Sequence, residues 1–170
     1  MSTALPPKPR TVQSRRRICI VASQYNEQFT DALVENAVAE LTELFPMSSI
    51  EVARVSGAFE IPVVVSTLAE TNAPDCIIAL GVILRGETGH ADLIADSITT
   101  GLQQISINTK VPVIHEVLLL NDEKQAFSRC IGESLNRGRE AARAALSVVE
   151  VLKELQRPTA RKAASRYANS

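Results

Sequence analysis

The 170-residue sequence has no tryptophan, and its aromatic residues make up only 4% of the chain. Aliphatic side chains must therefore fill any core, and the 45% of hydrophobic residues is enough for one. No apolar run reaches the length of about 18 residues that predicts a transmembrane helix. Residues 1–17 lack the apolar segment of a secretory signal. The sequence therefore predicts a cytoplasmic protein without a membrane partner.

Cysteine, glycine and proline are also scarce. The three cysteines are an odd number without metal-site spacing, so neither a disulfide framework nor a metal site is expected. Cys19 and Cys76 lie inside apolar runs, where a thiol usually acts as a small buried hydrophobe. Seven glycines and eight prolines are too few for a collagen-like or low-complexity chain. These absences leave an ordinary globular protein in a reducing compartment.

The net charge of −1 hides an uneven distribution of charge. Residues 1–17 contain five basic residues, residues 157–170 contain four, and neither segment contains an acidic one. The middle keeps nine of the 18 basic residues against all 19 acidic ones. Basic arms can bind nucleic acid, but only Tyr167 offers a ring for base stacking there. We therefore expect solvated arms and no nucleic-acid partner.

Short apolar runs alternate with segments of helical periodicity along the middle of the chain. This alternation predicts parallel strands joined by right-handed helical crossovers, so a three-layer α/β/α sandwich with a parallel four-stranded sheet. We expect one domain over residues 17–156, between a proline-rich arm at 1–16 and a basic tail at 157–170. The strands are predicted at 18–23, 50–55, 76–84 and 113–120, and the helices at 31–45, 61–70, 90–110, 122–130 and 138–156.

The segment Gly81-Val-Ile-Leu-Arg-Gly-Glu-Thr-Gly-His90 follows the most apolar strand. Ligands of such sheets bind beyond the carboxyl ends of the strands, and a glycine-rich loop before a helix presents free N–H groups to an anion. The loop has neither the lysine of a P-loop nor the dinucleotide fingerprint G-x-G-x-x-G. It therefore suggests a phosphate monoester more than a nucleotide, and a plain turn is the alternative.

His90 is one of only two histidines and stands at a predicted helix start. The positive end of the helix dipole favours the neutral imidazole there, which suits a proton shuttle beside an anion. A merely structural histidine is the alternative. Arg129 lies near a predicted helix end, where a cation complements the helix dipole without any further function.

Two further segments follow predicted strands and carry aromatic residues. Ser56-Gly-Ala-Phe-Glu-Ile-Pro62 offers Phe59 as a flat face and Glu60 as a carboxylate, although a capped helix start would look the same. Tyr25 and Asn26 follow the first strand, where Tyr25 could stack on a planar ligand or simply begin a helix.

Taken in order, these segments resemble the lumazine synthase family over residues 16–156. The Gly-x-Phe-Glu-Ile-Pro and Arg-Gly-x-Thr-x-His segments are the most specific. The matching residues are Ala22-Ser-Gln-Tyr-Asn26, Gly57-Ala-Phe-Glu-Ile-Pro62, Ala79 to His90, Pro112-Val113, Gln125-Ala126 with Arg129, and Asn136-Arg-Gly-Arg-Glu-Ala-Ala142.

The resemblance implies a flavodoxin-like fold, with a possible extra strand from the arm, and a transferase of riboflavin biosynthesis. That family condenses 5-amino-6-(D-ribitylamino)uracil with 3,4-dihydroxy-2-butanone 4-phosphate to 6,7-dimethyl-8-ribityllumazine, without metal or organic cofactor. It implies that His90 and Arg129 are catalytic and that phosphate binds Arg129, Gly86, Glu87 and Thr88. The residues implied for the pyrimidine and ribityl groups are Tyr25, Asn26, Ala58, Phe59, Glu60, Val82, Ile83 and His115.

The resemblance also implies a homopentamer in which His115 and Arg129 reach the neighbour's site. Some family members assemble twelve pentamers into an icosahedral shell. The short link from Arg129 to Gly138 favours that shell here, whereas the stiff segment Pro6-Pro-Lys-Pro9 opposes it. Both assemblies remain open.

Several positions depart from the family pattern. Ser56 replaces a proline, Ala91 and His115 each replace a phenylalanine, Glu116 replaces a small residue, and Arg137 replaces a lysine. These departures leave open a diverged binding or shell-forming homologue with weak turnover. On the fold alone, a flavodoxin-like binding module is a third possibility.

Overall fold

The computed structural model describes residues 5–71 and 73–156. Its four strands are β1 (Arg17–Ser23), β2 (Ser49–Val55), β3 (Cys76–Leu84) and β4 (Val113–Leu120). They pair in parallel in the order β2-β1-β3-β4. β1 and β3 are the central strands and are the most apolar, because both of their faces are covered.

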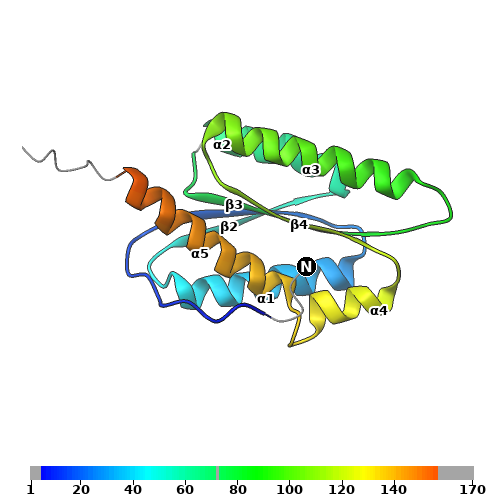
Figure 1. The fold of residues 1–170 in the computed structure, drawn as a ribbon, viewed down its shortest axis with the longest axis horizontal. Coiled ribbons are helices and arrows are strands. Elements are labelled where there is room, and N and C mark those ends of the chain that lie inside the picture. The colour runs from blue at the N-terminus through cyan, green and yellow to red at the C-terminus, as the bar shows by residue number, and fades with distance from the viewer. Residues whose placement is uncertain (1–4, 72, 157–170) are drawn as a thin grey trace, which may run out of the picture.

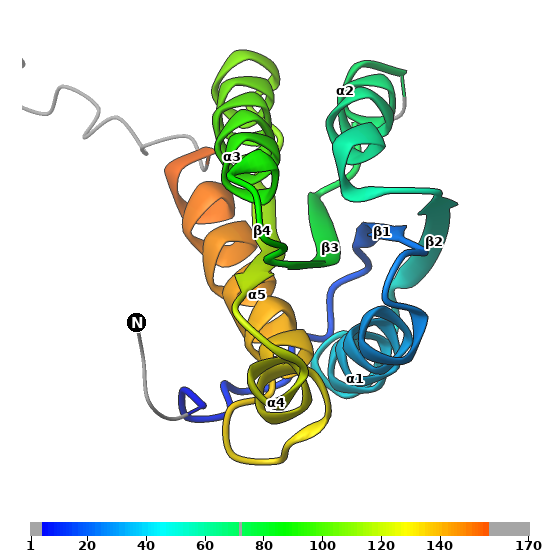
Figure 2. The ribbon, with the colours of Figure 1, turned by 90° about the vertical axis from the view of Figure 1, so that its right-hand side faces the viewer.

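Helices cover both faces of this sheet (Figures 1 and 2). Ile18, Ile20 and Ala22 point to the layer of α1 (Glu27–Leu44) and α5 (Arg137–Gln156). Cys19 and Val21 point to the layer of α2 (Ile61–Thr71) and α3 (His90–Thr109). The expected three-layer sandwich with a parallel four-stranded sheet is thereby confirmed. No helix in the described ranges is long and apolar enough to span a membrane.

Two helices differ from the prediction. α1 begins at Glu27 rather than Asp31, because Asn26 adopts a left-handed conformation (φ 59°, ψ 46°) that turns the chain straight from the sheet into the helix. The helix expected at 122–130 is only the short α4 (Glu123–Ala126), capped by Asp122, and continues as a π-helical turn, η2 (Phe127–Ile131). A short 3₁₀ turn, η1 (Ala58–Glu60), also precedes α2.

The described part of the N-terminal arm forms no strand, so the possible fifth strand is not present in this sheet. Pro6, Pro7 and Pro9 have no N–H to donate to a ladder. The arm instead packs on its own chain, where Val12 N–H donates to the carbonyl of Leu44 (2.8 Å) and Arg143 donates to the carbonyl of Pro6.

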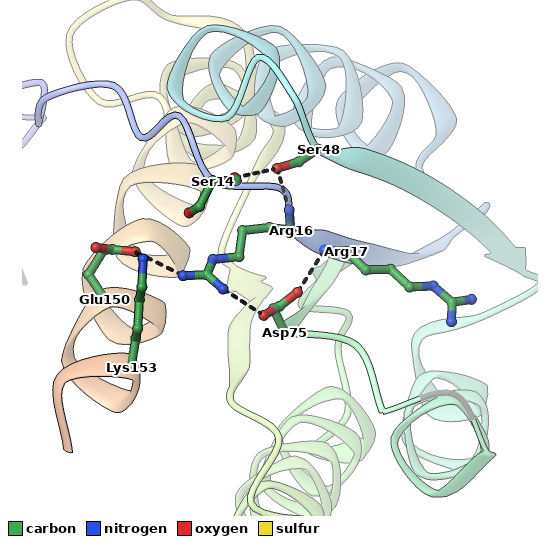
Figure 3. Close-up of polar contacts among 7 residues, drawn as sticks. All are labelled: Ser14, Arg16, Arg17, Ser48, Asp75, Glu150 and Lys153. Atoms are coloured by element: carbon green, nitrogen blue, oxygen red, sulfur yellow. Dashed lines mark hydrogen bonds and ion pairs between the residues drawn. The ribbon is translucent and has the colours of Figure 1, made fainter. Parts of the chain in front are cut away.

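Ion pairs fasten the start of β1 at the amino ends of the strands (Figure 3). The Arg16 guanidinium lies 3.3 Å from carboxylate oxygens of both Asp75 and Glu150. Asp75 also accepts the backbone N–H of Arg17 (2.8 Å), and Ser48 Oγ accepts that of Arg16 (2.8 Å). The charge of Arg16 is therefore paired with carboxylates of its own chain, and it holds the arm to the start of β3 and to α5.

Gly138 allows α5 to approach α1 closely. A Cβ atom at this position would clash with the carbonyl oxygen of Leu33 and lie 3.1 Å from the backbone nitrogen of Ala37. We expect Gly138→Ala to destabilise the fold by about 1–3 kcal/mol, because the two helices would have to separate. Thermal denaturation measures this loss.

Gly101→Ala is the matched control, because its new methyl group would lie 3.6 Å from Pro62 in ordinary contact. Alanine also favours the α3 helix by up to about 1 kcal/mol over glycine. An equal effect of the two substitutions on the melting temperature would contradict the close packing inferred at Gly138.

Candidate active site

The segments after β1, β2 and β3 meet at one end of the sheet, because the carboxyl ends of parallel strands lie together. The loop after β1 is joined to the end of β2 by backbone hydrogen bonds. Gln24 N–H donates to the carbonyl of Val55 (2.8 Å) and Tyr25 N–H to that of Ser56 (3.2 Å). Two segments that lie some 30 residues apart in the sequence are thus held side by side.

Tyr25, Gly57 and Glu60 form one cluster at this end of the sheet. Glu60 Oε2 accepts the backbone N–H of Gly57 (2.8 Å), which fixes the carboxylate over the start of η1. A Cβ at position 57 would lie 2.8 Å from this oxygen and 3.2 Å from the Tyr25 ring, so a larger residue there would push the Glu60 carboxylate away from its place. Tyr25 is 69% exposed and Phe59 is 59% exposed, whereas Ala58 is buried. Two aromatic faces are therefore open to a planar ligand.

Asn26 links the loop after β1 to β3. Its side-chain amide donates to the carbonyl of Val82 (2.7 Å), which the left-handed backbone of Asn26 permits. Val82 is buried and Ile83 is half-buried, and they pack on opposite faces of the sheet, Val82 towards α1 and α5 and Ile83 towards α2 and α3. Sequence spacing could not show this contact, because it joins the loop after β1 to a residue of β3 that lies 56 positions further along the chain.

The loop before α3 is exposed from Arg85 to His90. Gly89 caps α3 without a side-chain hydrogen bond, so the first N–H groups of the helix receive no side-chain partner there. Arg85 steadies the loop by binding Asp92 (2.7 Å) and Asn121 (2.6 Å). The hydrogen bond from Arg85 lowers the pKa of the Asp92 carboxyl. Gly86, Glu87, Thr88 and His90 thus surround a helix start suited to an anion.

His115 lies elsewhere, on the edge strand β4, and both of its ring nitrogens are engaged. Nδ1 accepts the backbone N–H of Val117 (3.1 Å), and Nε2 lies 2.8 Å from Thr99 Oγ1. An accepting Nδ1 carries no proton, so this geometry assigns the proton to Nε2, which donates to Thr99. Burial also lowers the pKa of His115. The imidazole is therefore held neutral and directed towards α3.

A cavity of about 440 Å³, here called the β4 cavity, runs along β4. His115 and Arg129 both line it. Arg129 projects from η2 and is half-buried, and its guanidinium makes no hydrogen bond or ion pair with residues 5–71 or 73–156. The predicted site residues therefore fall into two groups within one chain. One group lies at the carboxyl ends of β1 to β3, and the other lies along the open edge of β4.

Glu116 and Arg137 also line the β4 cavity but were not among the predicted site residues. Arg137 forms an ion pair with Glu140 one turn along α5. Burial raises the pKa of Glu116 to about 7, while the nearby Arg137 opposes this shift and Glu140 adds to it. The sequence offered one sign that Glu116 belongs to a site, because it is the single acidic residue within the otherwise mostly apolar run 113–120 and lies next to His115.

Comparison with known proteins matches this chain to a single family over most of the described residues. The family model described as 6,7-dimethyl-8-ribityllumazine synthase matches residues 15–153. The chain is 41% identical over 145 residues to the enzyme of that name from Mycobacteroides abscessus, covering 84% of this chain and 89% of the relative. It is 37% identical to the Thermococcus kodakarensis protein (82% and 88% covered) and 35% identical to that of Coxiella burnetii (85% and 96%), both of the same name.

Proposed function

The chain belongs to the 6,7-dimethyl-8-ribityllumazine synthase family, and from this premise we propose how its residues carry out the family's reaction. It is a transferase of riboflavin biosynthesis. It condenses 5-amino-6-(D-ribitylamino)uracil with 3,4-dihydroxy-2-butanone 4-phosphate, releasing phosphate and water. The match over residues 15–153 is the observation that carries this function. A diverged shell or binding protein is not favoured, because the three relatives above carry the enzyme's name.

The pyrimidine is assigned to the cluster at the carboxyl ends of β1 and β2. The exposed rings of Tyr25 and Phe59 offer flat apolar faces for it. Asn26 and Glu60 supply polar groups for the ribityl hydroxyls, and Glu60 keeps one oxygen beyond the one that binds Gly57. Ala58, Val82 and Ile83 are assigned as apolar neighbours of the substrate, and His115 is assigned to the site from another chain.

The phosphate of the second substrate is assigned to the start of α3 together with Arg129. Residues 86–88 supply exposed backbone N–H groups beside the positive end of the helix. The Arg129 guanidinium, which no carboxylate in the described ranges neutralises, supplies a bidentate donor that matches phosphate oxygens. These two features together account for the preference for a phosphate ester.

His90 is assigned the proton transfers. Imine formation requires a proton on the departing water, and elimination of phosphate requires removal of a proton from the butanone carbon chain. An exposed imidazole at the first residue of α3 can accept and return such protons next to the bound phosphate. The cluster of Tyr25, Gly57 and Glu60 would hold the pyrimidine, and the start of α3 would hold the phosphate ester, so both substrates would lie within reach of His90.

A site shared between two chains would explain why the predicted site residues form two separate groups within one chain. Arg129 and His115 line a cavity along the edge strand β4, whereas His90 lies beyond the end of β3. An edge strand is open to a neighbour, and head-to-tail contacts that use it close into a ring. The family resemblance implies that such a ring has five chains, so we assign a homopentamer with one site at each contact. The enzyme is further assigned to the cytoplasm, as a single domain at 17–156 with two arms and without a cofactor, nucleic-acid partner or membrane partner.

Mixed oligomers test the shared site. His90→Ala and Arg129→Ala are each expected to lose activity, but co-expressed chains form rings in which some sites receive His90 from one chain and Arg129 from the next. Random mixing restores about a quarter of the sites. Absorbance of the lumazine product measures this recovery, and mixtures of separately assembled variants serve as the control. Absence of recovery in verified mixed oligomers would place the whole site within one chain.

The mass of the assembly distinguishes a ring from a shell. Five chains of 18.4 kDa give about 92 kDa, and sixty give about 1.1 MDa. Sedimentation of the purified protein reads this value directly. A stable monomer with full activity would contradict the shared site.

A further inference from the structure

Glu116 places a carboxyl group in the β4 cavity without a hydrogen-bond partner among the described residues. It lies on β4 beside Leu80 of β3, and the same cavity is lined by Arg129 of η2 and Arg137 of α5. Its side-chain carboxyl makes no hydrogen bond or ion pair with residues 5–71 or 73–156. A carboxyl group thus shares a cavity with two guanidinium groups and has no partner of its own in the described chain.

The charges around Glu116 come from two elements. α5 contributes Arg137 and Glu140, which pair with each other, and η2 contributes Arg129 and the buried thiol of Cys130. Burial raises the pKa of that thiol to about 12, so it stays neutral. The cavity residues of α3, Ala95 and Thr99, are uncharged. His115 of β4 also lines the cavity, but burial lowers its pKa and both ring nitrogens are hydrogen-bonded, so it stays neutral.

Ionisation of Glu116 therefore decides the charge of the cavity. When it is ionised, two carboxylates balance the two guanidinium groups and an entering anion meets no net attraction. When it is protonated, the cavity carries one positive charge, and the carboxylic acid also gains an O–H that can donate to an anion. Its raised pKa of about 7 puts both forms within reach of ordinary working pH.

We propose that Glu116 couples anion binding in the β4 cavity to the uptake of one proton, so that phosphate binds when Glu116 is a neutral acid and leaves when it ionises. The inference rests on the proposed function, which assigns Arg129 to phosphate. Position 116 is one at which this chain departs from the family pattern.

Sulfate is the probe for this proposal, because it remains doubly charged across the working range whereas phosphate itself titrates there. Its affinity for the assembled protein is measured by calorimetry between about pH 6 and about pH 9. Above the pKa of Glu116, the dissociation constant is expected to rise about tenfold per pH unit. Buffers with different ionisation enthalpies should report uptake of up to about one proton per sulfate in the same range.

Two variants and a control make the result specific. Glu116→Gln is neutral at every pH, so its sulfate affinity should be independent of pH over this range. Glu116→Ala should behave likewise with weaker binding, and it serves if the glutamine variant fails to assemble. Glu123→Gln changes an exposed carboxyl on α4 and should keep the wild-type profile.

The wild-type pH profile in Glu116→Gln would overturn the proposal. If Arg129→Ala then abolished sulfate binding, the phosphate assignment would still stand. Unchanged sulfate binding in Arg129→Ala would overturn the phosphate assignment, and this inference with it. The two failures are therefore distinguishable.

Discussion

Replacing His90 with alanine is expected to lower kcat by about 10²–10⁴-fold, the usual contribution of a general acid–base group. Substrate KM values and the melting temperature should change little. The side chain is exposed at the first residue of α3 and makes no hydrogen bond to residues 5–71 or 73–156. Steady-state measurement of lumazine formation gives kcat, and thermal denaturation gives the stability.

Two comparisons separate a proton-transfer role from a structural one. Added imidazole should restore part of the activity of His90→Ala, because it replaces the lost proton carrier. Asp96→Ala, at an exposed position on the same helix, should keep wild-type kcat. An unchanged kcat in His90→Ala would remove the residue from the mechanism.

Replacing Arg129 with alanine is expected to raise KM for the butanone phosphate far more than KM for the pyrimidine. Loss of a charge-assisted pair in a desolvated interface costs about 2–5 kcal/mol, equivalent to about 30-fold to 4,000-fold. Arg129 is half-buried beside the β4 cavity and has no competing ion pair in the described ranges. Varying each substrate separately measures the two KM values.

Arg129→Lys keeps the charge but loses the bidentate geometry, so it should recover only part of the affinity. Lys124→Ala is the control, because this exposed cation lies on the adjacent α4 and outside the cavity. Equal increases in the two KM values would show that Arg129 does not act on the phosphate.

The strands were the most predictable elements. The bounds of β3 equal those expected from the apolar run at 76–84, because a strand covered on both faces needs an unbroken apolar sequence. The bounds of β4 also equal the expected 113–120, although His115 and Glu116 interrupt its apolar residues. The start of α1 was missed because the left-handed Asn26 is stabilised by the distant carbonyl of Val82. The π-helical turn at η2 was missed because periodicity cannot distinguish it from a continuing α-helix.

The sequence by itself determined the parallel α/β architecture and identified the segments after each strand, because periodicity and strand-end position are local properties. The motif order also carried the family resemblance, and the matched relatives confirm it. Sequence alone could not assign a proton to His115, because the assignment depends on which ring nitrogen accepts the backbone N–H of Val117 and which one faces Thr99 of α3.

Only the tertiary structure decided which of the marked residues meet. It joined Tyr25 to Gly57 and Glu60, and it separated Arg129 from His90 by placing Arg129 along the open edge of β4. It also brought Glu116 into the same cavity as Arg129. The physical reason is that charge and hydrogen bonding act through space, and the spacing of residues along a chain does not record which strand lies at the edge of the sheet.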